Sequence, residues 1–457
     1  MYDVIIIGGG PGGYLAAERL GYRGKRVLLV EKQYLGGTCL NVGCIPTKTL
    51  LNSAKLYLHA AEGAPFGVHA PGVSFSMAEM MAWKEKVVET LRSGVASQMK
   101  RCKVDVVSGT GVLEVNGPSR GVRVDGVLYE TRTVLVAAGS VPVMPPIPGA
   151  KDNPRVLDST GLLSTGEAPE RLCVIGGGVI GIEFASLFGA LGSQVSVVEM
   201  LDEIIPPMDK DLAPLMRRSL KNTVFHLGCR VTRIEDATVF FTSKDGKEES
   251  VAADTVLMAV GRRAETSSWA AKEAGVDVTP KGVNVDDRMR TNIPGVWAAG
   301  DVNGRSMLAH SAYRMAEVAV NDICAVLEGG TSADTMRYSA VPWAVYSIPE
   351  AAGIGLTEQE AAAKGIAVVT ASAPMVVSGR FIAENGVKAP GSVKVIVDAA
   401  NRRILGVHVL GPYASEMIWG AAALIENEMR VSDVREMVFP HPSVCEVIRE
   451  AIWNIKE

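Results

Sequence analysis

The sequence has no block of like charges and no repeated metal-ligand motif. Its 46 basic and 50 acidic residues give a net charge of -4 and are spread along the chain, which argues against nucleic acid or an anionic membrane surface as a partner. The start, at residues 1–4, lacks the basic residues that open a secretory signal. The apolar stretch 172–192 contains Glu183 and six glycines. We therefore expect a buried strand and helix there and no membrane span.

Cysteine is sparse, and most of it is isolated. The seven cysteines are an odd number and five of them stand alone in the sequence. This is not a disulfide framework, so we expect the reducing cytoplasm as the compartment. With 457 residues, 47% of them apolar, the chain is long enough for two or three domains with substantial cores, which excludes a disordered or fibrous protein. The five isolated cysteines are Cys102, Cys173, Cys229, Cys324 and Cys445.

Glycine, in contrast, is abundant, and its 48 residues gather in tight clusters. The first cluster, 8–13, follows the apolar run 3–7 and precedes a stretch with helical character. A second apolar run, 26–30, ends at Glu31. In this order of strand, glycine turn, helix, strand and acid, backbone amides and a helix N-terminus reach a pyrophosphate, and the carboxylate accepts ribose hydroxyls. The pattern predicts a dinucleotide-binding unit.

The same pattern occurs a second time. The apolar run 172–175 leads into the glycines of 176–181, and the run 194–198 ends at Glu199. In both copies the first glycine and the acid are 23 positions apart (31 − 8 and 199 − 176). One such fingerprint is weak evidence, but two copies in full context favour two dinucleotide sites. The plainer alternative is that one copy keeps the fold and has lost its ligand.

Later segments complete an α/β architecture. A buried strand is predicted at 133–138, and another at 291–299 that leads to Asp301, where an acid at a strand end can meet a bound polyol or can serve only as a turn residue. Two crossings, near 141–149 and near 261–263 (Gly261, Arg262 and Arg263), delimit an inserted domain, and the composition changes at about residue 339. We expect two Rossmann-like dinucleotide-binding domains and a C-terminal α+β domain. The predicted boundaries are 1–143, 144–264, 265–338 and 339–457.

The segment 36–48 carries the reactive chemistry. Cys39 and Cys44 are separated by four residues, which is too far for a disulfide on a regular helix, so distortion is expected from Gly43 and Pro46. The glycines before Cys39 also predict a helix N-terminus, whose partial positive charge stabilises a thiolate. This favours a reducible catalytic disulfide. A zinc site would need two more close ligands, and a pair of structural thiols is the plainer alternative.

The cysteine segment, the paired fingerprints and the near-terminal run 441–446 (HPSVCE) together resemble the pyridine nucleotide–disulfide oxidoreductases over the whole chain. The resemblance implies FAD on the first unit (1–143 with 265–338), NAD on the second (144–264), and a homodimer formed through 339–457. It also implies oxidation of a protein-bound dihydrolipoyl group with reduction of NAD. The lipoyl group would be carried by another protein, an acyltransferase subunit of a 2-oxoacid dehydrogenase complex or the glycine cleavage H protein.

The resemblance also assigns roles to residues. Cys39 resembles the interchange thiol that meets the substrate, and Cys44 the thiol against the flavin. Lys48 resembles the lysine beside the flavin, with Glu183 as its carboxylate partner, while His441 and Glu446 resemble the acid–base pair. No metal ligand is expected. For FAD the matching positions are Gly8, Gly10, Gly13, Glu31, Lys32, Gly37, Thr38, Cys39, Lys48, Gly111, Ala138, Gly139, Ser140, Asp301, Met307, Leu308, Ala309 and His310. For NAD they are Gly176, Gly178, Val179, Ile180, Gly181, Glu183, Glu199, Val231 and Gly261.

The sequence departs from the family pattern at two places. Ala138 stands where the family often has threonine, and Phe439, followed by Pro440, stands where many members carry a second histidine before His441. Glutathione-type reductases need arginines for NADPH where this chain has two acids in 199–202, and mercuric reductases end in a cysteine pair that 451–457 lacks. The alternative from another class is a non-enzymatic flavoprotein, such as a redox-sensing or scaffold subunit that kept the fold. For His441 the plainer alternative is that it only caps or packs near Pro442.

Overall fold

The computed structural model describes residues 1–117 and 119–456. The chain divides into two compact units. The first comprises Met1–Thr49, Glu79–Val143 and Gly261–Arg337, and the second comprises Leu50–Ala78, Met144–Val260 and Tyr338–Glu457. Over the described ranges, no helix is both long and apolar enough to cross a membrane.

The first unit is built on a mostly parallel sheet with the strand order β3-β2-β1-β6-β5-β4. A seventh strand, β19, pairs in parallel with residues 134–136 of β6. Residues Val4–Ile7 of β1 are 0–5% exposed, which is typical of a parallel strand covered on both faces. The strands are β1 (Tyr2–Ile7), β2 (Val27–Glu31), β3 (Asp105–Ser108), β4 (Val112–Asn116), β5 (Ser119–Val124), β6 (Val127–Val136) and β19 (Val296–Ala298).

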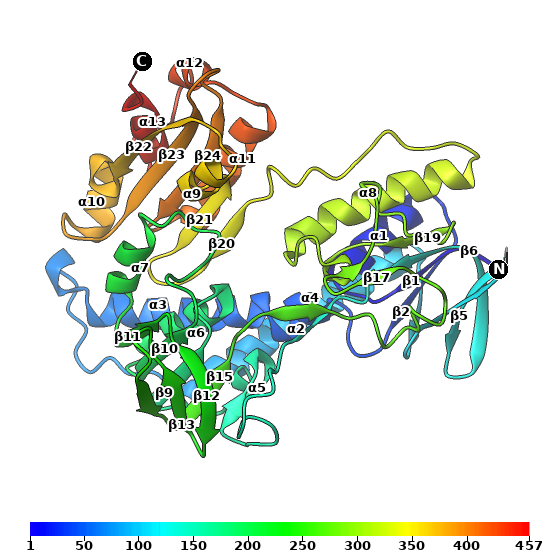
Figure 1. Cartoon of the computed structure of the whole chain (residues 1–457), viewed down its shortest axis with the longest axis horizontal. Coiled ribbons are helices and arrows are strands. Elements are labelled where there is room, and N and C mark those ends of the chain that lie inside the picture. The colour runs from blue at the N-terminus through cyan, green and yellow to red at the C-terminus, as the bar shows by residue number, and fades with distance from the viewer. Residues whose placement is uncertain (118, 457) are drawn as a thin grey trace. The chain divides into compact units, whose positions relative to one another are not determined.

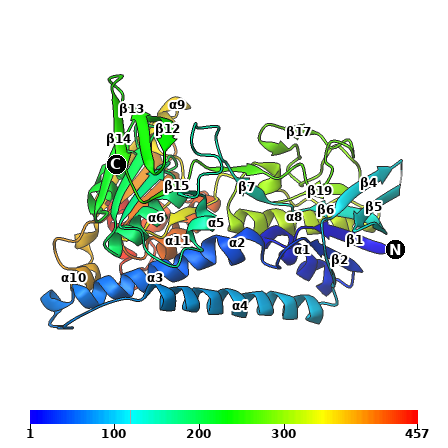
Figure 2. The ribbon, with the colours of Figure 1, turned by 90° about the horizontal axis from the view of Figure 1, so that it is seen from below.

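Helices α1 (Pro11–Tyr22) and α8 (Ala309–Leu327) of this unit lie side by side in both views (Figures 1 and 2). Two short strands, β7 (Ser140–Pro142) and β16 (Arg262–Ala264), pair antiparallel where the chain leaves and re-enters the unit. The remaining elements are α2 (Gly37–Val42), α3 (Cys44–Ala61, which continues into the second unit), α4 (Met77–Arg101), β17 (Val278–Thr279), β18 (Gly282–Val283) and the 3-10 turn η2 (Asp301–Asn303).

Two strands differ from the sequence prediction. β6 starts six residues before the predicted Thr133 and ends at Val136, so Ala138 lies in the turn that follows. The strand predicted at 291–299 is only β19, because Pro294 and Gly295 form a turn closed by a hydrogen bond from Val296 N–H to Ile293 O (3.0 Å), with Gly295 at φ +80°. The first strand thus ends before its predicted end, and the second begins after its predicted start.

The second unit contains a parallel sheet of order β11-β10-β9-β15-β8, with the buried apolar helix α6 (Val179–Ala190) following β9. A three-stranded antiparallel sheet, β12-β13-β14, follows it in the chain. The elements are β8 (Val156–Leu157), α5 (Ser159–Leu162), β9 (Arg171–Ile175), β10 (Gln194–Glu199), α7 (Ala213–Ser219), β11 (Thr223–Leu227), β12 (Arg230–Glu235), β13 (Thr238–Thr242), β14 (Glu248–Ala252), β15 (Thr255–Met258) and the 3-10 turn η1 (Ala64–Phe66).

The same unit ends in an antiparallel sheet of order β20-β21-β24-β23-β22, whose buried face packs with α11 and α13. Lys394 on β23 is 2% exposed, and its ammonium lies 3.0 Å from the buried carboxylate of Asp209, which ties this sheet to the chain after β10. The elements are β20 (Trp343–Val345), β21 (Ala351–Gly355), α9 (Glu358–Ala363), β22 (Val368–Pro374), η3 (Met375–Val377), α10 (Gly379–Asn385), β23 (Ser392–Asp398), β24 (Ile404–Leu410), α11 (Ala414–Glu426), α12 (Val431–Arg435) and α13 (Glu446–Trp453).

Candidate functional site

The first glycine loop is a tight turn between β1 and α1. Gly8 has φ +102°, and a Cβ there would lie 2.3 Å from the carbonyl oxygen of Ala137. A Cβ on Gly13 would lie 1.8 Å from the carbonyl oxygen of Gly8. Both positions therefore require glycine, since any side chain would force the helix away from the strand.

The second loop has the same construction between β9 and α6. Gly176 has φ +109°, and a Cβ there would lie 2.5 Å from the carbonyl oxygen of Ala259. A Cβ on Gly181 would lie 2.0 Å from the carbonyl oxygen of Gly176. The sequence repeat is therefore a structural repeat.

The N-cap glycines of the two helices have a different reason to be glycine. Gly10 and Gly178 both have φ -74°, which any residue adopts, and no side chain caps either helix. A Cβ on Gly178 would meet no atom of the protein within 4 Å, and one on Gly10 would make only an ordinary contact at 3.7 Å. Glycine at these positions leaves room beside a helix N-terminus, and this space fits the pyrophosphate of a dinucleotide.

The two acids, Glu31 and Glu199, each accept two backbone hydrogen bonds, one of them from the adjacent glycine loop. One carboxylate oxygen of Glu31 accepts a hydrogen bond from Gly9 N–H (2.6 Å) and the other accepts one from Gln33 N–H (2.8 Å). Glu199 does the same with the N–H groups of Gly177 (2.5 Å) and Leu201 (2.7 Å). Because a carboxylate offers about four lone-pair positions, each acid can still accept a hydroxyl. The predicted ribose contacts fit this geometry and stay predictions.

The cysteine segment is attached to the first glycine loop. Gly36 N–H donates to the carbonyl oxygen of Gly9 (2.8 Å), and Gly37 lies so close to Gly10 that an added Cβ would be 2.5 Å from its Cα. This contact places α2, which carries Cys39 as its third residue, next to the candidate pyrophosphate site. Sequence reasoning identified Gly37 only as a cofactor contact, whereas here it also sets the position of the helix.

A break between two helices brings the cysteines together. α2 ends at Val42, Gly43 adopts φ -143° and ψ -109°, and Cys44 begins α3. The predicted distortion at Gly43 is confirmed. The distortion predicted at Pro46 is wrong, because Pro46 lies in the first turn of α3, where a missing N–H costs no helical hydrogen bond.

All seven cysteines are thiols in the structure. A hydrogen bond with the Cys44 side chain, together with burial, raises the pKa of Cys39 well above its usual range, and the charge of Lys48 opposes this rise. The Cys39 thiol is therefore harder to ionise than an ordinary cysteine when the pair is reduced. Asn41, which was not among the predicted site residues, fixes the chain just before Cys39. Its amide donates to Leu35 O and Gly37 O, and its oxygen accepts from Arg92 Nε (2.9 Å).

Ser140 and Asp301, both predicted for FAD, meet at the strand ends. Ser140 Oγ donates to Asp301 Oδ2 (2.5 Å), and Arg262 donates from Nε to Ser140 Oγ (2.8 Å) and from Nη2 to Ser140 O (2.7 Å). Burial raises the pKa of Asp301, which Ser140 and Arg262 partly oppose. Arg262 was predicted only as part of a crossing, and its position directly after Gly261 was the available signal.

The remaining predicted FAD residues lie in the first unit. A Cβ on Gly111 would lie 3.1 to 3.4 Å from Val122, Val30 and Ile7. Tight packing therefore also favours glycine at this position, apart from the predicted contact with FAD. Lys32 follows β2, Thr38 is the second residue of α2, and Gly139 O accepts from Glu265 N–H (2.9 Å). The run 307–310 leads into α8, with Leu308 as its N-cap and Ala309 and His310 as its first residues.

The other predicted NAD residues follow the first glycines of the second loop in the sequence, some directly and others after further elements. Val179, Ile180 and Gly181 open α6. Val231 lies on β12, whose start is held to the end of β10 by a hydrogen bond from Cys229 N–H to Glu199 O (2.8 Å). Gly261 belongs to the first unit and has φ +114° with no protein atom near an added Cβ.

Glu183 and the C-terminal pair lie in the second unit. Glu183 is 3% exposed on α6 and accepts a hydrogen bond from Tyr346 N–H (3.0 Å). Its predicted pairing with Lys48, which belongs to the other unit, stays a prediction. His441 Nδ1 lies 2.8 Å from Glu446 Oε1, and the His441 side chain is 77% exposed. Hydrogen bonds from Ser443 N–H and His441 hold the pKa of Glu446 below its usual range, so the ionised carboxylate orients the exposed imidazole through Nδ1.

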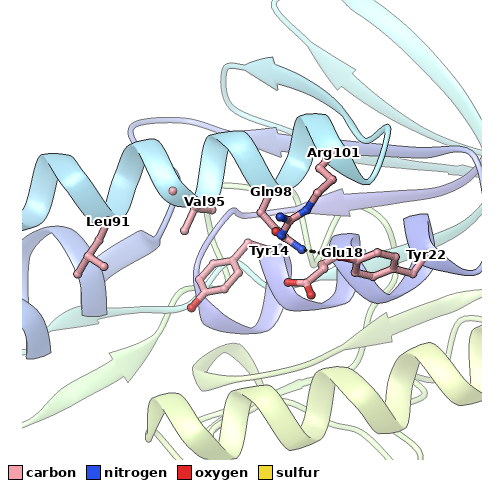
Figure 3. Close-up of a pocket in the computed structure, with 8 residues that line it drawn as sticks. Tyr14, Glu18, Tyr22, Leu91, Val95, Gln98 and Arg101 are labelled. Atoms are coloured by element: carbon pink, nitrogen blue, oxygen red, sulfur yellow. Dashed lines mark hydrogen bonds between the residues drawn. The ribbon is translucent and has the colours of Figure 1, made fainter.

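A cavity of about 470 Å³ lies in the first unit between α1 and α4, which run side by side in Figure 3. Leu91 lies at one end of it, Tyr14 lies further in, and Tyr22 and Arg101 lie toward the other end. The Gln98 amide donates to the Tyr22 hydroxyl (3.2 Å). Sequence reasoning missed this cavity because its residues come from helices about 80 positions apart. In the described part of the chain, no set of three His, Cys, Asp or Glu side chains is arranged to hold a metal ion.

Known proteins resemble this chain over nearly its full length. Dihydrolipoyl dehydrogenase 3 of Pseudomonas putida is 37% identical over 468 residues, covering 99% of this chain and 98% of the relative. Dihydrolipoyl dehydrogenase of Thermus scotoductus is 38% identical, with 98% and 96% covered. The Cu(II) complex of the HOCl-induced flavoprotein disulfide reductase RclA of Escherichia coli matches with a TM-score of 0.86 at 30% identity, covering 100% of this chain and 99% of that one.

The family comparison agrees with the geometry. Residues 341–452 match the dimerisation domain of the pyridine nucleotide-disulphide oxidoreductases, and residues 2–316 match the pyridine nucleotide-disulphide oxidoreductase family itself. The two glycine loops, the reactive cysteine pair and both matches place the chain in one family. It belongs to the pyridine nucleotide-disulphide oxidoreductases.

Proposed function

We propose that the chain is a dihydrolipoyl dehydrogenase, which oxidises a protein-bound dihydrolipoyl group to lipoyl and reduces NAD+ to NADH. The observation that supports this most directly is the exposed His441 imidazole held by Glu446 at 2.8 Å, because a dithiol substrate needs a general base that removes its proton. Curated relatives with this activity in their names, 35–38% identical over almost the whole chain, support the same substrate.

The enzyme uses FAD and NAD. The first glycine loop, Glu31 and the Ser140–Asp301 pair would hold FAD, and the second loop with Glu199 would hold NAD. The corresponding domains are 1–143 with 265–338 for FAD, 144–264 for NAD, and 339–457 for dimerisation. Bound FAD supplies the two-electron connection between the cysteine pair and the nicotinamide.

The thiol chemistry depends on the cysteine pair and the base. His441 removes the proton of one substrate thiol, and the resulting thiolate attacks Cys39 in the oxidised pair. The Cys39–Cys44 bond breaks, and Cys44 leaves as a thiolate. His441 releases the first proton to solvent and takes the proton of the second substrate thiol, whose sulfur then attacks the substrate sulfur of the mixed disulfide, and Cys39 leaves as a thiolate. The substrate thus loses two electrons and two protons, and the cysteine pair gains the electrons.

The direct test is turnover by the purified holoenzyme with dihydrolipoamide and NAD+, followed as NADH absorbance. We expect turnover that His441→Ala reduces by roughly a thousandfold. Protein that contains stoichiometric FAD but produces no NADH would overturn the proposal. Free lipoyl domains of an acyltransferase and of a glycine cleavage H protein, compared as substrates, would then identify the partner. The isolated cysteines favour the cytoplasm as the place where this occurs.

His441 is proposed to serve the cysteine pair of a second subunit in a homodimer, in which each C-terminal domain completes the partner's site. Hybrid dimers of His441→Ala and Cys44→Ser subunits test this. Each parent homodimer should be nearly inactive, while the hybrid combines one intact cysteine pair with one intact histidine and should recover activity. Hybrids that stay inactive although both parents dimerise and bind FAD would show that His441 does not act across subunits.

A further inference from the structure

Three helices of the first unit begin close to one another, and two tyrosines lie at this place. Tyr14 is in the first turn of α1, and Tyr313 is in the first turns of α8. The two helices touch there, since a Cβ on Gly12 would lie 3.6 Å from the carbonyl oxygen of Ala312. The start of α2 packs on the start of α1 through Gly37 and Gly10. Cys39 therefore lies near both tyrosines.

The tyrosines form a pair. Their hydroxyls are hydrogen-bonded to each other, and their rings meet edge to face with centroids 6.0 Å apart. Either hydroxyl can be the donor. Whichever one donates, its partner keeps an O–H that this hydrogen bond does not use, so the pair as a unit has one proton left to donate.

Burial and the neighbouring charges favour a role of the tyrosine hydroxyls as hydrogen-bond donors. Burial raises the pKa of both tyrosines, and the nearby Cys39 sulfur adds to the rise for each of them. Both hydroxyls therefore stay protonated at neutral pH and cannot act as bases. Tyr14 also feels the charge of Glu18 on α1, while the groups facing Cys39 from α3 are Cys44 and Lys48. A negative charge on the Cys39 sulfur would be stabilised by a further hydrogen-bond donor.

We propose that Tyr14 and Tyr313 are positioning residues for Cys39, and that the remaining O–H of their hydrogen-bonded pair donates to the Cys39 sulfur when that sulfur leaves the mixed disulfide. This inference rests on the proposed function. In that step the second substrate thiolate forms the lipoyl disulfide bond, the bond between substrate and Cys39 breaks, and the electron pair stays on Cys39. A hydrogen bond to the leaving thiolate makes it a better leaving group.

The test measures the Cys39 thiolate itself. In the Cys44→Ser holoenzyme, Cys39 is the only thiol left of the pair, and its alkylation by iodoacetamide, quantified by peptide mass, follows the thiolate fraction as a function of pH. Adding Tyr14→Phe and Tyr313→Phe together should raise the pH midpoint and slow alkylation at pH 7 about tenfold, because a charge-assisted hydrogen bond is lost. The single variants show which hydroxyl is the donor, since its removal has the larger effect.

Tyr22→Phe is the matched control, because Tyr22 lies on the same helix and lines the cavity beside Tyr14. It should leave the midpoint unchanged. Phenylalanine keeps the edge-to-face ring contact, and FAD content with near-UV circular dichroism reports folding. An unchanged midpoint in the double variant, or an equal shift in Tyr22→Phe, overturns the inference. If the midpoint moves but the wild-type enzyme does not oxidise dihydrolipoamide, the proposed substrate is wrong and the role of the tyrosines stands.

Discussion

The glycine loops of the two units have nearly the same backbone but different neighbours. Their first glycines have φ +102° and +109°, and their N-cap glycines both have φ -74°. In each loop the carbonyl oxygen of the second glycine accepts one backbone hydrogen bond, from Gly36 at 2.8 Å in the first unit and from Ile205 at 2.9 Å in the second. The geometry that would hold a dinucleotide is therefore the same twice.

The segments that donate these two hydrogen bonds differ in chemistry. In the first unit, Gly36 leads within three residues to Cys39 at the start of a helix. In the second, Ile205 leads to Met208, and both are buried apolar side chains. The segment attached to the first loop thus carries a cysteine of the predicted redox pair, whereas the segment attached to the second loop contributes buried apolar side chains. The redox role proposed for the first unit therefore depends on the attached segment and not on the glycine fingerprint.

The largest effect on the difference between the two units is expected when a sulfur of the cysteine pair is removed. Cys44→Ser should lower turnover by roughly a thousandfold or more and abolish the long-wavelength absorption that a thiolate gives beside bound flavin. Cys39→Ser should lower turnover equally but keep that absorption, because Cys44 remains. Anaerobic spectra of both variants measure this. If Cys39→Ser loses the absorption and Cys44→Ser keeps it, the two roles are reversed.

Glycine substitutions separate the two loops. In Gly13→Ala the new Cβ would clash with Gly8 O at 1.8 Å, and in Gly181→Ala with Gly176 O at 2.0 Å, each costing about 3 kcal/mol of local strain. We expect Gly13→Ala protein to be purified with little FAD, and Gly181→Ala protein to keep its FAD but bind NADH roughly a hundredfold more weakly. Flavin absorbance and NADH titration measure the two effects.

Gly94→Ala is the control for these substitutions, because Gly94 lies inside α4 and an added Cβ would meet no atom within 4 Å. Alanine there should stabilise the protein by about 0.5–1 kcal/mol through its higher helix propensity. A loss of FAD from Gly181→Ala equal to that from Gly13→Ala would show that the loops do not act independently.

The sequence predicted the repeat well because its signals are local. The order of strand, glycines, helix, strand and acid at 3–31 and 171–199 depends on residues that are neighbours in the chain, and the structure has each element in that order. The break at Gly43 was predictable for the same reason. The hydrogen bond of Arg262 to Ser140 and the Tyr14–Tyr313 pair join residues more than 100 positions apart, and no periodicity or motif connects such positions.

The acids provide a finer comparison. Glu31→Ala leaves the N–H groups of Gly9 and Gln33 without their acceptor, and Glu199→Ala does the same to Gly177 and Leu201. We expect Glu31→Ala to lower bound FAD, and Glu199→Ala to raise the KM for NAD+ roughly tenfold with FAD content unchanged, since each lost hydrogen bond costs about 1–3 kcal/mol. The glutamine variants keep one acceptor oxygen and should lie in between. Unchanged KM in Glu199→Ala would contradict a nucleotide-binding role for this acid.

The smallest expected effect concerns which nucleotide the second loop accepts. A 2′-phosphate beside the Glu199 carboxylate is repelled, so NAD+ should be preferred over NADP+ by tenfold or more in kcat/KM, which is about 1.4 kcal/mol. Asp202 should matter less, because it is 73% exposed and paired with Lys244 at 2.6 Å, where water screens the charge. Glu199→Ser should therefore narrow the preference, whereas Asp202→Ser should change it by less than about threefold. Steady-state kinetics with both nucleotides decide the matter: equal efficiencies in the wild type would mean that Glu199 only braces its loop and does not face the ribose.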